Sequence, residues 1–417
     1  MMTWILGNIV KQIESGTESW RAESRGGKSL ANEHGELYDK KHLKSDVVQE
    51  AIQLQNRNLI QIDWVKGYRG SDIERIRYRL EEKAAFYILY QQEVDSGFLP
   101  KQEKVRLYQE FLKRQLSKVK KKWIREYYND LLKRSENKRK ADVFELLEQE
   151  KKYAPCFLGL DEIEESIFKR IFSKKYLGNT KTFEKEMEGH IISAAKKFCP
   201  DVEREMDDTT ILQQLFIEEY AQELSLKGEL HFRIKEENGS FQEINTGCYC
   251  FGTTLNSQTL EHAVLDQEQK IQKIVIFENK ANYISAPYKD GILYLFSHGY
   301  FSPKECRFLK QLHQVLKNQT SCEVQYFHSG DLDYGGIKIF QYIRKTIFPE
   351  LEPLQMDVET YEAYQEFAEE LETETLEKLK QVQDENPQIQ ELIRKLLETG
   401  KGIEQECFLI EKRGNRT

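Results

Sequence analysis

The fold is decided by three stretches, KIVIFENKANY (273–283), GILYLFSHGY (291–300) and EVQYFHSGDLDYGGIKIFQYIR (323–344). Each contains a short apolar run bounded by charged or small residues, which is typical of a strand buried on both faces. Helical spacing separates the second and third runs at residues 303–317, and it resumes after the third run at residues 337–347. Strands that alternate with helices predict a parallel α/β sheet with right-handed crossovers.

Acidic residues follow two of these apolar runs. Glu278 comes directly after the first run, and Asp331 and Asp333 follow the third in the sequence Gly-Asp-Leu-Asp. Ligands of parallel sheets bind at the carboxyl ends of the strands, so we expect these three carboxylates to meet at one edge. They would repel one another without a cation between them, and oxygen ligands suit Mg²⁺ or Mn²⁺. Because Mg²⁺ also binds phosphate oxygens, this edge predicts phosphoryl-transfer chemistry.

The same residues have plainer interpretations. An Asp-x-Asp sequence beside glycine is also typical of a simple turn at the end of a strand. Lys280, two residues after Glu278, either holds a phosphate oxygen or lies on the surface as most lysines do. His298, after the second apolar run, either carries protons or is a buried histidine bonded to a carbonyl.

The spacing of the acidic residues resembles a Toprim domain, the metal-binding module of topoisomerases, primases and several nucleases. ENKANY, the Gly299-Tyr300 step, YFHSGDLDYGGIKIFQYIR and the later LQMD (354–357) further resemble the JetD-like nuclease subunits of Wadjet anti-plasmid systems. Those subunits are in turn similar to the A subunit of topoisomerase VI. The resemblance is strongest over residues 271–357, and it is weaker but present on both sides.

This resemblance implies a metal-dependent DNA endonuclease in which Glu278, Asp331 and Asp333 are the catalytic and metal-binding residues. It implies a homodimer that cuts double-stranded, closed circular plasmid DNA delivered by an SMC-type motor complex. JetD-like chains also carry an E-Q-E near the carboxyl end, which here places Glu404 and Glu406 as further metal ligands or as a brace for the first site. Asp357, after an expected fourth strand, has the same status; capping or a solvated surface position is the alternative.

Two other functions remain open from the sequence. One is a topoisomerase-like DNA breaker that uses a tyrosine, and the other is a catalytically idle DNA-binding subunit with a Toprim fold. The tyrosine of topoisomerase VI lies in its winged-helix domain, and the tyrosines in the corresponding part of this chain stand in no motif that we recognise. We therefore expect hydrolysis by water. The candidate tyrosines are Tyr38, Tyr68, Tyr78, Tyr283, Tyr300 and Tyr334.

The composition is that of a soluble protein of two to four domains: 417 residues, 32% charged and 39% hydrophobic. Because the net charge is −8, this chain would bind nucleic acid only through a local basic face. No apolar run approaches the length of a membrane span, and the amino end does not resemble a secretory signal. Seven scattered cysteines are expected to be reduced thiols in the cytoplasm.

The first part of the chain, residues 1–82, is expected to be a winged-helix-like unit. Helical patterns cover residues 4–13 and 45–57, the second with Ser45 as its cap. Two expected strands flank the basic tip VKGYRGSD, which is typical of a wing. Lys66 and Arg69 in this tip are candidates for phosphate contacts. A winged helix that contacts protein, with solvated charges, is the alternative.

The next part, residues 83–176, is expected to be a charged helical arm. Its basic run includes Lys120, Lys121 and Lys122, with Trp123, Tyr127 and Tyr128 interleaved. Two interpretations of this run are open. Either its basic face lies along DNA, or it is an exposed helix whose apolar stripe packs on a neighbouring helix.

A mixed α/β connector is expected over residues 177–266, with a helix at 210–224 and a hairpin around Asn238-Gly239. Residues 267–417 complete the chain as the Toprim nuclease domain with C-terminal helices.

Overall fold

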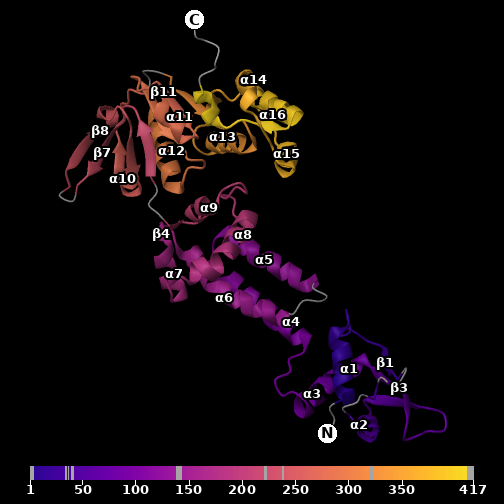
Figure 1. Ribbon diagram of the computed structural model, residues 1–417. Helices are drawn as coiled ribbons and strands as arrows, with labels where there is room; N and C mark the ends of the chain where they lie inside the picture. The colour runs from indigo at the N-terminus through magenta and orange to yellow at the C-terminus, as the bar shows by residue number, and fades with distance from the viewer. Residues whose placement is uncertain are drawn as a thin grey trace. The chain divides into compact units, whose positions relative to one another are not determined.

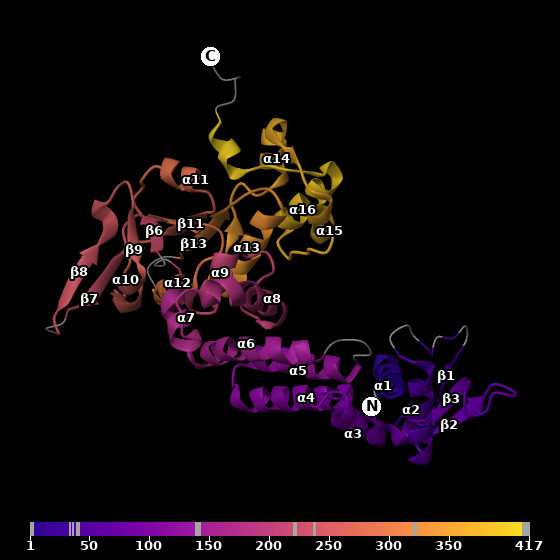
Figure 2. The same ribbon diagram turned by 60° about the horizontal axis from the view of Figure 1, so that its bottom comes forward.

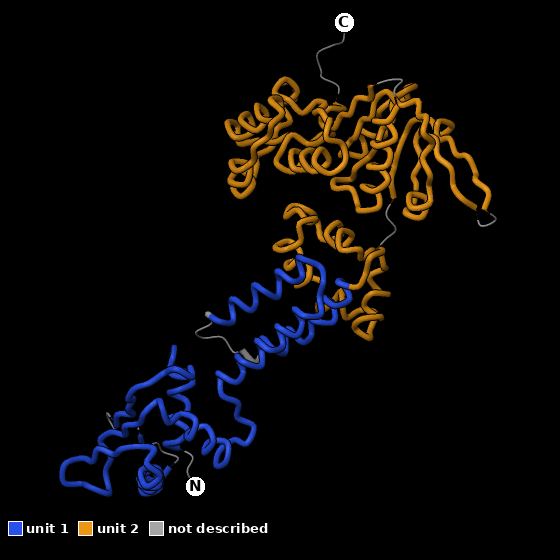
Figure 3. Tube along the Cα trace, turned by 180° about the vertical axis from the view of Figure 1, so that it is seen from behind, with its two compact units in different colours: residues 1–161 blue, residues 162–417 orange. Residues whose placement is uncertain are grey.

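The structure is a computed structural model that describes residues 4–32, 35, 37–38, 42–137, 143–219, 223–236, 239–319 and 323–410 (Figure 1). The chain divides into two compact units, residues 1–161 and 162–417, which are coloured separately in Figure 3. The division falls inside the stretch expected as one helical arm. Within the described ranges, no helix is both long and apolar enough to cross a membrane.

The first unit begins with two helices and a three-stranded antiparallel sheet. The helices are α1 (Trp4–Ser15) and α2 (Lys44–Asn56), and the strands β1 (Gly27–Ala31), β2 (Ile60–Trp64) and β3 (Ile73–Arg79) lie in the order β1-β3-β2. The expected helices and the pair of strands around the tip are therefore present. The expected cap is wrong, because Leu43 is the N-cap residue of α2 and Ser45 lies inside the helix.

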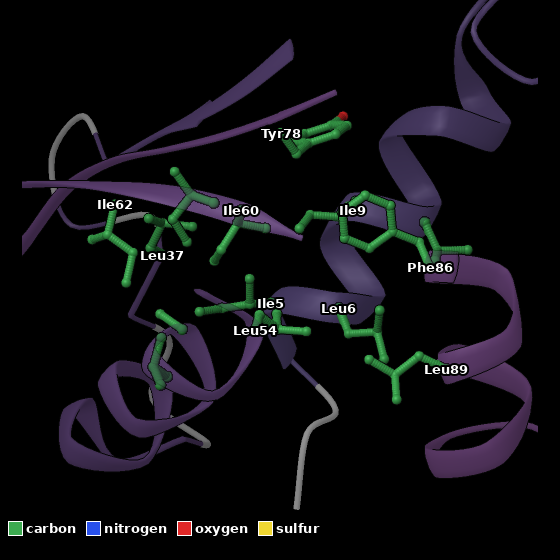
Figure 4. Packing of buried hydrophobic residues seen from close by; sticks show 14 of the residues in the cluster. Ile5, Leu6, Ile9, Leu37, Leu54, Ile60, Ile62, Tyr78, Phe86 and Leu89 are labelled. Atoms are coloured by element: carbon green, nitrogen blue, oxygen red, sulfur yellow. The ribbon is translucent and has the colours of Figure 1, made fainter. Parts of the chain in front are cut away.

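The core of this region forms where the sheet, α1 and the next helix meet. Ile76 and Tyr78 of β3 are buried while Arg75, Arg77 and Arg79 are exposed, which follows the two-residue period of a strand. Ile73 is also buried, and the irregular pairing of β3 with β2 before Arg75 breaks the period there. Phe86 and Leu89 of α3 (Lys83–Glu93) pack on the same cluster, as Figure 4 shows beside Ile9 and Leu6. The core therefore continues past the boundary expected at residue 82.

Three longer helices follow, α4 (Lys101–Lys118), α5 (Lys122–Asn137) and α6 (Val143–Glu162). Trp123 and Tyr127 of α5 are buried against Phe157 of α6, with ring centroids 6.0 and 4.3 Å apart. The Tyr127 hydroxyl donates to the buried Glu150 carboxylate at 2.9 Å. The aromatic side chains of the basic run thus form a stripe packed on a neighbouring helix, as one of the two interpretations expected. Residues 138–142, which carry the end of that run, lie outside the described residues.

The second unit opens with short helices and a small antiparallel sheet. The helices are α7 (Lys169–Leu177), α8 (Glu188–Phe198) and α9 (Asp208–Gln214), and the sheet has the order β10-β7-β8, where β10 is Ala263–Leu265. Strands β7 (His231–Lys235) and β8 (Phe241–Asn245) form the expected hairpin, whose turn residues 237 and 238 lie outside the described residues. The helix expected at 210–224 is wrong for residues 215–219 and 223–224, because Phe216 adopts a φ of 63° and strands β5 (Ile217–Glu218) and β6 (Glu223–Lys227) follow. Residues 220–222 of that expected helix lie outside the described residues.

A six-stranded sheet forms the centre of the second unit, in the order β14-β13-β11-β12-β6-β9. Its parallel strands are β11 (Lys273–Phe277), β12 (Ile292–Phe296), β13 (Gln325–Ser329) and β14 (Glu352–Pro353). The helices α11 (Lys280–Ser285), α12 (Pro303–Asn318) and α13 (Tyr334–Thr346) connect them. This confirms the parallel α/β sheet expected from the sequence. Two antiparallel strands, β6 and β9 (Thr253–Asn256), extend it on the β12 side.

The carboxyl-terminal segment returns to the end of this sheet. Helices α14 (Val358–Tyr364), α15 (Thr373–Leu379) and α16 (Pro387–Thr399) lie beside α13, on the side away from β7 and β8 (Figure 2). The chain then runs back, and Ile403 pairs with Leu332 in an antiparallel bridge. The Leu332 N–H donates to the Ile403 carbonyl at 2.8 Å, and the Ile403 N–H donates to the Leu332 carbonyl at 3.1 Å. This bridge carries residues 404–406 to the Asp-Leu-Asp turn.

Candidate functional site

Glu278 and Asp331 meet where two neighbouring strands end. Strands β11 and β13 pair in parallel, with Phe277 opposite Ser329, so that the residues after them leave the sheet side by side. The Glu278 N–H donates to the Ser329 carbonyl at 3.0 Å. The Asp331 N–H donates to the Glu278 carboxylate at 3.3 Å. The parallel register thus brings together two of the three expected carboxylates.

Asp333 lies at the start of α13. It is the N-cap residue of that helix, and its Oδ1 accepts a hydrogen bond from the Gly336 N–H at 2.8 Å. Burial raises the pKa of Asp333 above its ordinary range. Its charge also contributes to raising the pKa values of Glu278, Asp331 and Glu404, so it belongs to the same electrostatic group.

The tightest group of ligand atoms includes residues from the carboxyl-terminal segment. Among the described residues, Asp331, Glu404 and Glu406 each offer a carboxylate oxygen within 4.8 Å of the others. The Leu332–Ile403 bridge accounts for this arrangement, because it sets the E-Q-E directly against the Asp-Leu-Asp turn. The spacing is compatible with one divalent cation bound by carboxylate oxygens.

Electrostatics points to the same chemistry. Burial, with the nearby carboxylates, raises the pKa of Glu278 to about 8. Burial likewise raises the pKa of Asp331 to about 7, against a backbone hydrogen bond that lowers it. Burial and the charges of Asp333 and Glu406 raise the pKa of Glu404. Like charges held close in a poorly solvated place favour bound protons or a bound cation, and an all-oxygen donor set fits Mg²⁺ or Mn²⁺.

Two glycines let the backbone approach this group closely. A Cβ at Gly330 would lie 2.4 Å from Glu278 Oε2 and 2.9 Å from Nε2 of the fully buried His328. A Cβ at Gly336 would lie 2.2 Å from the Asp331 carbonyl oxygen and 2.9 Å from the Asp331 nitrogen. Any larger residue at Gly336 would therefore displace the backbone that carries Asp331.

Asp357 lies apart from the tight cluster of Asp331, Glu404 and Glu406. It is the N-cap residue of α14, and its Oδ1 accepts a hydrogen bond from the Thr360 N–H at 2.7 Å. Strand β14 ends earlier, at Pro353. The structure thus gives Asp357 a capping contact, which was the alternative interpretation.

Lys280 and His298 occupy different surroundings. Lys280 is exposed at the first position of α11. His298 adopts a φ of 45°, and its Nε2 lies 3.1 Å from a carboxylate oxygen of the fully buried Glu305. Burial lowers the pKa of His298, but the hydrogen bond and charge of Glu305 outweigh it, so that the pKa is raised. A backbone hydrogen bond of the ring at His298 itself adds to this rise, so the Glu305 carboxylate is a partner besides the carbonyl that was expected.

The other basic residues expected to touch DNA lie in the first unit. Lys66 and Arg69 are exposed between β2 and β3. Lys120 is exposed, and its backbone N–H donates to Asp161 at 2.8 Å. The Lys121 ammonium donates to the Leu160 carbonyl at 2.6 Å, which gives it a structural role at the end of α6. The Lys122 side chain is 89% exposed, and its ammonium lies 3.9 Å from Glu126.

Sequence reasoning missed Gln405, which lies between the two acidic residues of the E-Q-E. It is fully buried, whereas Glu404 and Glu406 are exposed. A polar residue between two acids gives no periodic signal of burial. Only the pairing of Ile403 with Leu332 reveals that this segment enters the sheet edge.

Comparison with known proteins places this site in a family. Residues 240–413 match the family model for the C-terminal part of the Wadjet protein JetD. The Wadjet protein JetD of Bacillus cereus (strain Q1) is 29% identical over 363 residues, covering 85% of this chain and 83% of that protein. All five acidic residues of the site fall within the matched region: Glu278, Asp331, Asp333, Glu404 and Glu406. These matches support a JetD-like Wadjet subunit, with the family-model match at residues 240–413.

Proposed function

We propose that this chain is a metal-dependent endodeoxyribonuclease, the nuclease subunit of a Wadjet-type defence complex. The observation that carries the proposal is the meeting of half-buried carboxylates after β11 and β13 with exposed carboxylates of the carboxyl-terminal segment at one sheet edge. Burial raises the pKa values of Glu278, Asp331, Asp333 and Glu404, and repulsion by neighbouring carboxylates adds to the rise for all of them except Asp333. Strongly perturbed carboxylates in one place are characteristic of functional sites.

Asp331, Glu404 and Glu406 would hold the cation, because their oxygens lie within 4.8 Å of one another. Glu278 approaches Asp331 from the neighbouring strand, where it would complete the site or orient the attacking water. Asp333 is held by α13 and adds negative charge beside them. Bound Mg²⁺ or Mn²⁺ supplies Lewis acidity toward a phosphate and lowers the pKa of a coordinated water.

The tyrosine residues favour hydrolysis over a covalent phosphotyrosine. A nucleophilic tyrosine needs a lowered pKa or an adjacent base. Burial raises the pKa values of Tyr38 and Tyr283 to about 12, and it raises those of Tyr78, Tyr300 and Tyr334 further. Tyr68 is exposed, and the only carboxylate in the tip sequence VKGYRGSD is that of Asp72. This carboxylate forms an ion pair with the Lys44 ammonium at 2.8 Å.

The substrate and partners follow from the JetD likeness. The Bacillus cereus relative is named as a Wadjet protein, so we infer an SMC-type motor complex as the partner and closed circular plasmid DNA as the substrate. A homodimer with one site for each strand would account for cutting of both strands. The exposed Lys66 and Arg69 would anchor the duplex through its phosphates.

The proposal is tested by incubating supercoiled plasmid with the purified chain and Mn²⁺, alone and with its partner complex. Wild type should linearise or nick the plasmid, and Glu278→Ala and Asp331→Ala should not. A covalent protein–DNA adduct after denaturation would favour the tyrosine mechanism instead. Absence of cutting by wild type with either ion and with the partner complex would favour an idle DNA-binding subunit.

A further inference from the structure

Gln405 is a fully buried polar residue in the middle of the acidic cluster. The residues on either side of it, Glu404 and Glu406, are exposed, while Gln405 itself is 0% exposed. Burying an amide group is costly unless its donors and acceptors have partners. The contacts of Gln405 therefore indicate why the chain buries this residue here.

Four hydrogen bonds join Gln405 to the ends of two strands and to α11. Its backbone N–H donates to Asp331 Oδ1 at 2.7 Å. Its side-chain Nε2 donates to Ser329 Oγ at 2.7 Å, and its Oε1 accepts from the Asn279 N–H at 2.8 Å. Its backbone carbonyl accepts from Asn282 Nδ2 at 3.0 Å.

The two side-chain contacts reach the strands that carry the acidic residues. Ser329 is the last residue of β13, two positions before Asp331, and Asn279 directly follows Glu278. The Gln405 amide side chain thus bridges the carboxyl ends of β11 and β13. Ser329, like Gln405, is fully buried. The backbone of the same residue orients the Asp331 carboxylate, and its two neighbours in the chain are Glu404 and Glu406.

We propose that Gln405 is a positioning residue of the metal centre, which fixes the spacing of Glu278 and Asp331 and holds Glu404 and Glu406 against them. This inference rests on the proposed metal-dependent function. Groups that orient metal ligands by hydrogen bonds typically change metal affinity or activity by about 10- to 100-fold when they are removed. The same range is expected here.

A purely structural role would give a different result, and Gln269 provides the matched control. Gln269 is another buried glutamine of the same unit that ties backbone segments together. Its Oε1 accepts from the His231 N–H at 3.0 Å, and its Nε2 donates to the His231 carbonyl at 2.7 Å. Its contacts are to the small sheet and lie outside the acidic cluster.

The test is titration calorimetry of Mn²⁺ into the full chain, together with thermal unfolding without metal. Gln405→Met keeps the side-chain length and removes both side-chain hydrogen bonds, and it should weaken Mn²⁺ binding about 10- to 100-fold. Gln269→Met should lower the melting temperature without metal but leave the dissociation constant for Mn²⁺ within about twofold of wild type. Ser329→Ala removes only the Nε2 contact, and about a threefold to tenfold loss of affinity is expected from the same effect.

The outcomes separate this inference from the function on which it rests. Unchanged Mn²⁺ affinity in Gln405→Met, with binding by wild type, overturns the positioning role and leaves the metal centre standing. No Mn²⁺ binding by wild type overturns both. If Gln405→Met does not fold, Ser329→Ala decides: weaker binding supports the role, and binding equal to that of wild type overturns it.

Discussion

Two regions carry several charges: the tip between β2 and β3, and the sheet edge after β11 and β13. They differ in whether neighbouring charges are opposite or alike. Near the tip, the Arg77 guanidinium lies 2.7 Å from Asp63, and these two side chains are 57% and 35% exposed. At the sheet edge, the charges that raise the pKa values of the half-buried Glu278 and Asp331 are other carboxylates. Exposed pairs of opposite charge contribute little to stability and need no special function. Buried groups of like charge are unfavourable, and a fold retains them where they bind something.

The strongest way to break this comparison is to remove one of the half-buried carboxylates. Asp331→Asn keeps the shape of the side chain and removes a ligand from the cluster with Glu404 and Glu406. We expect the rate of plasmid cleavage with Mn²⁺ to fall by about 10³-fold, which corresponds to about 4 kcal/mol of transition-state stabilisation. The measurement is the initial rate of loss of supercoiled plasmid at saturating Mn²⁺.

Asp357→Asn is the matched control for that experiment. Asp357 caps α14, and asparagine is an equally good N-cap residue, so stability should change by less than about 0.5 kcal/mol. Cleavage should stay within about twofold of wild type. Equal losses in Asp331→Asn and Asp357→Asn would contradict the assignment of the site to the tight cluster.

The second contrast is between two adjacent glycines, Gly335 and Gly336, of which only Gly336 lies very close to the Asp331 backbone. A Cβ at Gly336 meets the Asp331 backbone at 2.2 Å, whereas a Cβ at the adjacent Gly335 meets only Asp333 Oδ1, at 3.3 Å. Overpacking of this kind typically destabilises by about 1–3 kcal/mol, and we expect Gly336→Ala to reach the upper end. Gly335→Ala should change the free energy of unfolding by about 1 kcal/mol or less, because alanine also favours the helix. Urea unfolding of both variants checks this, and similar values for the two would contradict the close approach.

How far the sequence predicts this site depends on which contacts are local to the sheet. Glu278 and Asp331 were predictable as neighbours, since parallel strands place their carboxyl ends at one edge and β11 pairs with β13 in register. The approach of Glu404 and Glu406 was not derivable from spacing, because it depends on a bridge between Leu332 and Ile403, far apart in the chain. Their candidacy came from family resemblance alone.

The errors in the fold have similarly physical causes. Residues 215–224 have a helical apolar pattern, yet Phe216 adopts a φ of 63°. The chain then continues into β5, which pairs in parallel with β4 (Ile167–Phe168), and into the antiparallel strand β6. Tertiary pairing of β6 with β12 overrides the local preference there. The cap of α2 was misplaced because the helix begins at Lys44, one residue before Ser45, so that the Ser45 side chain lies inside the first turn.

The third contrast appears in the pH dependence of stability without metal. The pKa of Glu278 is raised from its ordinary 4.5 to about 8, so between these values the folded chain holds a proton that the unfolded chain has released. Stability therefore falls as pH rises through this window, by about 2 kcal/mol between pH 6 and 8. For a unit of this size, that corresponds to a fall of about 5 °C in melting temperature. Thermal unfolding at the two pH values, with and without Mn²⁺, measures the effect.

Two substitutions and added Mn²⁺ show which carboxyl group causes the fall in melting temperature with pH. Glu278→Gln should reduce the fall in the second unit, where Asp331, whose pKa is raised to about 7, also contributes. Mn²⁺ should offset the fall in wild type by favouring the charged carboxylates. Burial also raises the pKa of Glu150 in the first unit to about 7, so Glu150→Gln should flatten a separate pH dependence on which Mn²⁺ has no effect. A melting temperature that rises with pH in the absence of metal would contradict the raised pKa of Glu278.

The smallest expected effect lies at the exposed tip, where charge acts only through solvent. Replacing Lys66 and Arg69 together by alanine should weaken DNA binding equally for all sequences and reduce the slope of log K against log salt by about 2. Arg77→Ala is the control, because its guanidinium is already paired with Asp63, and it should change the slope by less than about 1. Binding isotherms at several salt concentrations, without divalent ions, measure both slopes. If the double variant leaves the slope unchanged, the tip does not contact phosphates. That result would support the alternative interpretation, in which this region contacts protein.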